Sequence, residues 1–146
     1  MKQILCVIDL TESSGKVLEV GATISKACGA HMVVLFPYRL IHQGPRGDIS
    51  SLKIRLETEA REKFRYLKGT ISSMGEVSVE FQPEIGFIAD RINAYVRKNN
   101  IDMIIVGQQL TDPTNDIKGF DLQTLISDSK SPFVIVPTEV KVTAHA

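Results

Sequence analysis

Apolar residues follow two alternating patterns along the chain. Short runs in which almost every residue is apolar are typical of strands covered on both faces of a parallel sheet. Stretches in which apolar or small residues recur every three or four positions indicate amphipathic helices. The predicted strands cover 4–8, 32–36, 77–81, 103–106 and 133–136, and the predicted helices cover 17–28, 52–71, 85–96 and 122–126.

This alternation predicts an α/β fold. Right-handed crossovers join such an order into an open, doubly wound, five-stranded parallel sheet with helices on both faces, as in Rossmann-like proteins. Residues 77–81 alternate apolar and polar side chains, so this strand should be half exposed or lie at a sheet edge. Pro37 and Pro83 are expected to end the second and third strands, because proline lacks the N–H that a ladder needs.

The composition fits one soluble domain. The 146 residues match a typical domain length, and 43% apolar with 23% charged residues provides both a core and a polar surface. Lys plus Arg and Asp plus Glu both total 17, so no charge excess favours nucleic acid or a membrane surface as a partner. No apolar run approaches the ~20 residues of a membrane helix. We therefore expect a cytoplasmic protein with a single domain over 1–146.

The cysteines and histidines do not predict a metal or catalytic site. Cys6 and Cys28 are isolated in apolar surroundings, which predicts two buried thiols in a reducing compartment. The three histidines, His31, His42 and His145, are too scattered to form a zinc site with them. No serine lies in a nucleophile elbow, and no carboxylate pair is apparent. We predict no catalytic residue and no metal ligand, and hence a protein that is not an enzyme.

Four segments carry a resemblance to a known family. The first strand ends in Asp9 and a Ser-rich turn, and Gly86 precedes a helix with Ile88 and Ile92. Residues 102–107 read as a strand that begins with Asp and ends with Gly, and residues 131–137 follow as the last strand. Together they resemble the universal stress protein family over nearly all of 1–137. The resemblance implies the adenine nucleotide alpha hydrolase-like fold and a role in the stress response.

In ATP-binding members of that family, the fourth strand is followed by a Gly-x-x-Gly-x9-Gly-Ser/Thr loop that holds the phosphates. Gly107 matches the first glycine, but Leu110 stands at the second and Phe120 at the third, with Asp121 at the hydroxyl position. Allowing one deletion brings Gly119 to the third position. A side chain at Leu110 opposes close backbone approach, and Asp112, Asp116 and Asp121 add negative charge. We therefore expect no cofactor and no ATP binding of the usual kind.

The alternative is a protein whose altered loop binds AMP, ADP, ATP or another small anion. Asp9 would then lie near the base and ribose, as the resemblance implies, or it only braces the first strand–helix turn. Pro37 would contact the base, or it only ends its strand. The candidate nucleotide contacts are Asp9, Leu10, Pro37, Gly107 and Gly119.

The last strand predicts the assembly. Phe133, Val134, Ile135 and Val136 are apolar on both faces, although this strand should lie at a sheet edge. Family members similar to this chain pair these strands antiparallel across a two-fold axis, which implies a homodimer. The tail 137–146 alternates as a strand would and is expected to add to that contact. Other protein partners are also expected.

Overall fold

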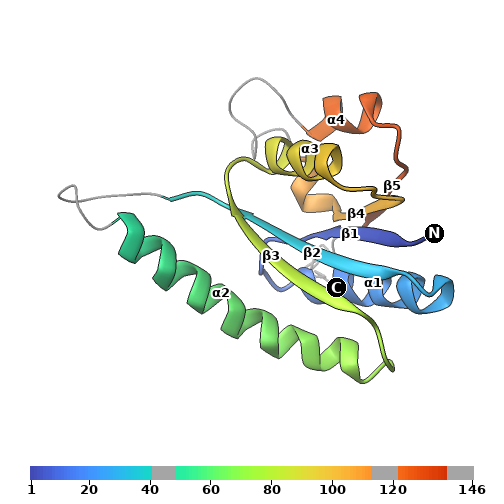
Figure 1. Cartoon of the computed structure of the whole chain (residues 1–146), viewed down its shortest axis with the longest axis horizontal. Helices are drawn as coiled ribbons and strands as arrows, with labels where there is room; N and C mark the ends of the chain where they lie inside the picture. Colours follow the sequence, from blue (N-terminus) through green and yellow to red (C-terminus); the bar gives the residue numbers. More distant parts are fainter. Residues whose placement is uncertain (41–48, 113–121, 138–146) are drawn as a thin grey trace, which may run out of the picture.

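The structure is a computed structural model that describes residues 1–40, 49–112 and 122–137. Its five strands are all parallel and form one sheet in the order β3-β2-β1-β4-β5 (Figure 1). The strands are β1 (Gln3–Val7), β2 (His31–Tyr38), β3 (Val79–Ile85), β4 (Met103–Gly107) and β5 (Phe133–Val136). The helices are α1 (Ser14–Cys28), α2 (Ile49–Ser72), α3 (Ile88–Lys98) and α4 (Leu122–Asp128), with a 3-10 turn, η1 (Gln108–Thr111), after β4.

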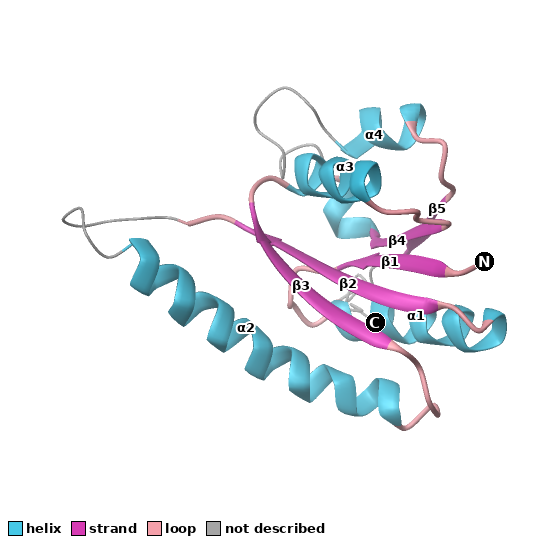
Figure 2. Cartoon of the chain, in the orientation of Figure 1, coloured by secondary structure: helices cyan, strands magenta, loops and turns pink. Residues whose placement is uncertain are grey.

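Helices cover both faces of the sheet (Figure 2). Successive residues of a strand point to opposite faces, so Ile4 and Cys6 of β1 pack with α1 and α2, whereas Leu5 and Val7 pack with α3 and α4. All four side chains are fully buried. The predicted doubly wound parallel sheet is confirmed. No helix in the described parts of the chain is long and apolar enough to cross a membrane.

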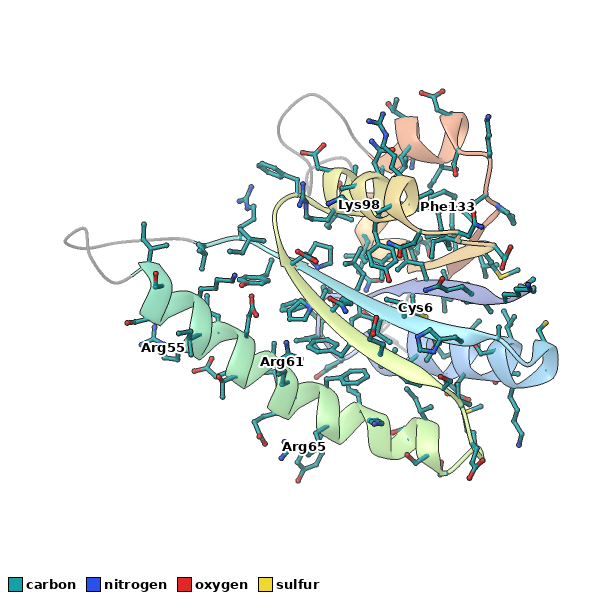
Figure 3. All side chains as sticks on the ribbon, in the orientation of Figure 1. Cys6, Arg55, Arg61, Arg65, Lys98 and Phe133 are labelled. Atoms are coloured by element: carbon teal, nitrogen blue, oxygen red, sulfur yellow. The ribbon has the colours of Figure 1, made fainter. Side chains whose placement is uncertain are left out.

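A glycine in α1 allows the helix to lie close to the sheet. A Cβ at Gly21 would be 2.5 Å from Cys6 Sγ and 2.8 Å from Met32 Sδ, closer than real contacts allow. Figure 3 shows Cys6 on the sheet beside α1. Burial raises the pKa of the Cys6 thiol to about 12. Cys28, in contrast, is exposed at the end of α1, so the prediction of a second buried thiol was wrong.

The third strand differs from its prediction in position and length. It covers Val79–Ile85 and passes through Pro83, and α3 begins at Ile88 rather than at Ile85. Met32 N–H donates to Ser78 C=O and Gly86 N–H donates to Tyr38 C=O, both at 2.8 Å. Because bonding groups alternate along a strand, the odd-numbered residues of β3 direct their backbone groups to the open edge. The N–H that Pro83 lacks would have faced this open edge, where there is no strand to accept it. The proline therefore breaks no ladder bond.

The second strand also continues through its proline, to Tyr38, so the expected stop at Pro37 was wrong. Ile8 N–H donates to Leu35 C=O at 3.0 Å, and the pairing of β1 with β2 ends at Val7 and Leu35. Pro37 is two residues further on and would direct its N–H toward β1, beyond the last paired residue. No ladder bond is lost there, and β2 keeps pairing with β3 on its other side.

Candidate functional site

The strand order reverses between β1 and β4. The chain leaves β1 toward α1 on one face of the sheet and leaves β4 toward η1 and α4 on the other. In open α/β sheets ligands bind at such a switch point, outside the carboxyl ends of the strands. Gly107 is the last residue of β4, and Asp9 follows the last residue of β1, Val7, by two positions, so both lie at this edge as the sequence predicts. We call residues 8–14 and 107–112 the switch edge.

Asp9 holds the turn between β1 and α1. Its Oδ1 oxygen accepts hydrogen bonds from Thr11 N–H at 3.0 Å and from Ser14 Oγ at 3.1 Å, and also from the Thr11 hydroxyl. Ser14 is fully buried, so this contact fixes the carboxylate against the first turn of α1. Of the two roles considered for Asp9, bracing of the turn is the one in this geometry. Among the described residues, no donor reaches the other oxygen, Oδ2.

Leu10 completes the same turn in an unusual backbone conformation. Its φ is 59°, in the left-handed region that residues other than glycine, asparagine and aspartate seldom adopt. Its side chain packs against the core between the sheet and α1. Leu10 therefore shapes the turn that carries Asp9 and Thr11. A contact between Leu10 and a nucleotide stays a prediction.

A hydrogen-bond chain crosses the switch edge. Ser13 precedes α1 but makes no side-chain cap, and its hydroxyl lies 2.6 Å from Gln109 Nε2 and 3.0 Å from Thr11 Oγ1. Thr11 has one hydroxyl proton and gives it to Asp9, so it must accept from Ser13. Ser13 in turn accepts from the Gln109 amide. The chain runs in one direction, Gln109 to Ser13 to Thr11 to Asp9, and ends on a carboxylate.

The backbone after β4 forms a tight turn in place of an open glycine-rich loop. The turn is η1, Gln108–Thr111, and Leu110 within it is 3% exposed. Leu110 packs into the core beneath α3 and α4, so its bulk points into the protein rather than along the strand ends. The carboxamide of Gln109, the residue before Leu110, lies against Gly107. A Cβ placed on Gly107 would be 2.8 Å from Gln109 Nε2.

Gln109 is the residue that sequence reasoning missed. It occupies an unspecified position of the phosphate-loop pattern, so the pattern carries no signal for it. The remaining predicted loop residues, Phe120, Asp121 and Gly119, lie outside the described residues, as does His42.

The carboxyl end of β2 is tied to α2 rather than to the switch edge by the contacts that the structure shows. Pro37 lies within β2, paired in register with Glu84 of β3. The hydroxyl of its neighbour, Tyr38, donates a hydrogen bond to the carboxylate of Glu57. Burial, followed by this bond and the negative charge of Glu57, raises the pKa of Tyr38 well above its usual range. A contact between Pro37 and a base stays a prediction.

One Ser–His contact occurs among the described residues, at the opposite end of the sheet. His31 Nδ1 lies 2.6 Å from Ser78 Oγ, where β2 begins beside the residues that lead into β3. The two residues are neighbours through strand pairing, because Met32 N–H donates to Ser78 C=O. In the same part of the chain, no three His, Cys, Asp or Glu side chains gather as a metal site would require.

Comparison with known proteins gives the following similarities. The sequence model of the Universal stress protein family matches residues 1–137. The structure is similar to that of the universal stress protein UspA from Lactobacillus plantarum, with a TM-score of 0.72 and 14% identity over 92% of this chain and 97% of that one. No curated protein matches the chain in sequence.

Several similar structures contain nucleotides. One is described as a universal stress protein in complex with cAMP, with a TM-score of 0.68 and 17% identity over 93% of this chain and 96% of that one. Another is the universal stress protein from Archaeoglobus fulgidus in complex with dAMP, with a TM-score of 0.63 and 15% identity over 93% of this chain and 97% of that one. At these identities the similarity establishes the fold alone.

Proposed function

This chain belongs to the universal stress protein family, whose members are stress-response proteins, and we propose that it is a non-catalytic member that does not bind ATP in the family's usual way. We further propose that it acts as a homodimer or through protein partners. It has no resident cofactor in this proposal.

The turn after β4 carries this proposal. A phosphate-binding loop needs backbone N–H groups that face the ligand and glycines that let it approach. Here η1 anchors Leu110 in the core, and the Gln109 carboxamide lies on Gly107, the one glycine that matches the family pattern without a gap. Asp112, exposed just after η1, adds a negative charge that opposes a triphosphate.

The absence of catalysis in this proposal is supported by the placement of polar groups. The His31–Ser78 contact lies at the amino ends of the strands, away from the switch edge. The nearby Asp102 carboxylate already accepts two backbone N–H groups, from Lys2 and Gln3. At the switch edge, Asp9 accepts bonds from its own turn and has no histidine partner among the described residues.

Calorimetric titration of the purified protein with ATP and with AMP, each with and without magnesium, tests the proposal. We expect no heat of ATP binding at tens of micromolar protein. A dissociation constant for ATP in the micromolar range would overturn it. Thermal unfolding of the same sample, recorded by circular dichroism, ensures that a negative result comes from folded protein.

Binding of a mononucleotide is the second candidate function. It is favoured by Asp9 Oδ2, which accepts no hydrogen bond from the described residues and faces no competing donor there. A carboxylate oxygen of this kind is a suitable acceptor for a ribose hydroxyl. The cAMP and dAMP complexes of similar proteins are in keeping with such a ligand. Binding of AMP without binding of ATP in the same titrations would favour this candidate.

Strand β5 supports the proposed homodimer. Ile104 N–H donates to Pro132 C=O at 3.0 Å, so by alternation Phe133 and Ile135 direct their backbone groups to the open edge. The strand carries no charge, and the side chain of Ile135 is 45% exposed. An edge with free backbone groups and exposed apolar side chains favours pairing with another chain. The expected contribution of the tail 138–146 falls outside the described residues.

A further inference from the structure

We propose that Gln109 is the residue that decides whether the switch edge accepts a nucleotide: its side chain takes the place beside Gly107 that a phosphate would occupy, and its removal opens the site. This inference rests on the proposed function, in which ATP is not bound in the usual way, and adds the group responsible. Gln109 acts here as a specificity-determining residue, with adenine nucleotides as the class of ligand.

The first step is the contact between Gln109 and Gly107. Carboxamide atoms of Gln109 lie within 2.8 and 2.9 Å of the point where a Gly107 Cβ would be, Nε2 and Cδ respectively. Because glycine has no side chain, the amide lies directly on the backbone at the end of β4. A phosphate that approached this backbone, as phosphates do at the carboxyl ends of parallel strands, would meet the amide first.

The second step is how the amide is held. Gln109 Nε2 donates to Ser13 Oγ at 2.6 Å, across the switch edge from η1 to the start of α1. Ser13 passes the bond to Thr11, and Thr11 passes it to the Asp9 carboxylate. Bonds that follow one another in one direction strengthen each other, and a charged acceptor at the end strengthens the last one. The carboxamide of Gln109 is thereby held in one position beside Gly107.

The third step is that the side chain of Gln109 can be removed without a change in the backbone of η1. Leu110, the next residue, is anchored in the core with α3 and α4, and η1 is therefore fixed independently of Gln109. Shortening Gln109 removes the carboxamide and leaves the turn in place. Thr11 still gives its one proton to Asp9, but the Ser13 hydroxyl, no longer an acceptor for the amide, can turn its proton from Thr11 to a phosphate oxygen.

The test compares Gln109→Ala with wild type by calorimetric titration with AMP and with ATP. The matched control is Gln108→Ala, an exposed glutamine in the same turn. Gln109→Glu keeps the size of the side chain but places a negative charge where a phosphate would lie. We expect Gln109→Ala to bind AMP or ATP at least about tenfold more tightly than wild type, and the other two variants to show no gain.

Equal affinity of a folded Gln109→Ala variant and wild type for both nucleotides would overturn the inference. Failure of the proposed function is a separate outcome, since micromolar ATP binding by wild type would show it whatever the variant does. If Gln109→Ala does not fold, Gln109→Ser provides the second arm. It also removes the carboxamide and leaves Ser13 and Thr11 in place, and a folded Gln109→Ser variant without any gain in affinity would then overturn the inference.

Discussion

Asp102 Oδ2 lies 2.7 Å from the backbone nitrogen of Lys2, so the residue before β4 holds the residue before β1. The same oxygen accepts the N–H of Gln3 at 3.0 Å, and Asp102 N–H donates back to Gln3 C=O at 2.9 Å. An aspartate at this position thus continues the pairing of β1 and β4 beyond their ladder, with its side chain in the place of a backbone carbonyl.

A pH-dependent contribution to stability follows from this contact. The backbone N–H groups of Lys2 and Gln3 lower the pKa of Asp102 from its ordinary value of 3.8. A lowered pKa in the folded state contributes stability that is present above the ordinary value and is lost as the pH falls through the folded value. We expect Asp102→Asn to be less stable than wild type near pH 7, with a difference that shrinks as the pH falls below 3.8 and through the lowered pKa of the folded state.

Urea unfolding of wild type and Asp102→Asn across this pH range measures the effect. Glu59→Gln, at an exposed position of α2, is the matched charge-removal control and should show no such trend. A destabilisation by Asp102→Asn that is the same at low and neutral pH would contradict the assignment, because it would not depend on the charge.

Gly21 should not tolerate even one methyl group. A Cβ there would be 2.5 Å from Cys6 Sγ and 2.8 Å from Met32 Sδ, both in the core. Overpacking costs about 1–3 kcal/mol, against a gain in helix propensity of up to about 1 kcal/mol. We expect Gly21→Ala to lower the free energy of unfolding in chemical denaturation.

Gly69 in α2 is the matched control, since a Cβ there meets nothing within 4 Å. Gly69→Ala should raise the free energy of unfolding by up to about 1 kcal/mol. If both variants were stabilised, the close approach of α1 to the sheet would not exist in solution.

Leu110 should be a stability position rather than a position that controls ligand access. It is 3% exposed and packs beneath α3 and α4. We expect Leu110→Ala to lower the free energy of unfolding by about 2–5 kcal/mol, the usual cost of such a truncation in a core. The exposed Gln108→Ala serves as the reference in the same unfolding experiment. A neutral Leu110→Ala would mean that η1 does not anchor the loop.

The β5 edge should determine the oligomeric state. Ile135→Asp places a charge on the open edge, where it would be buried without a partner in the dimer. We expect wild type to be a dimer by light scattering at tens of micromolar and Ile135→Asp to be a folded monomer. Ile54→Asp, at a position of α2 that is 67% exposed, should remain a dimer. A wild-type monomer under these conditions would contradict the assembly.

The apolar runs predicted β1 and β4 well, because both strands are buried on both faces. Almost every residue of such a strand is apolar, so the run of apolar residues coincides with the strand. The errors at Pro37 and Pro83 share one cause. Proline interrupts a strand only where its N–H would have met a partner, and strand order decides this. Residues 77–81 alone do not reveal which of their backbone groups face β2.

The same distinction applies to the switch edge. Asp9 and Gly107 were predictable at the ends of adjacent strands, because their positions follow from topology. The contact of Gln109 with Gly107 and Ser13 follows from the conformation of η1 and the rotamer of one side chain. No residue spacing in the sequence predicts this contact. The role of a glutamine at position 109 can be inferred only once the conformation of the turn is known.

Pro83 has a consequence for how far this protein can assemble. The sheet ends in two strands: Pro83 interrupts the outward backbone donors of β3, whereas the two outward residues of β5, Phe133 and Ile135, both keep their N–H. In the proposed homodimer the β5 edges pair with each other, which leaves the interrupted β3 edges outermost. We therefore expect assembly to stop at two chains rather than to continue into a fibre.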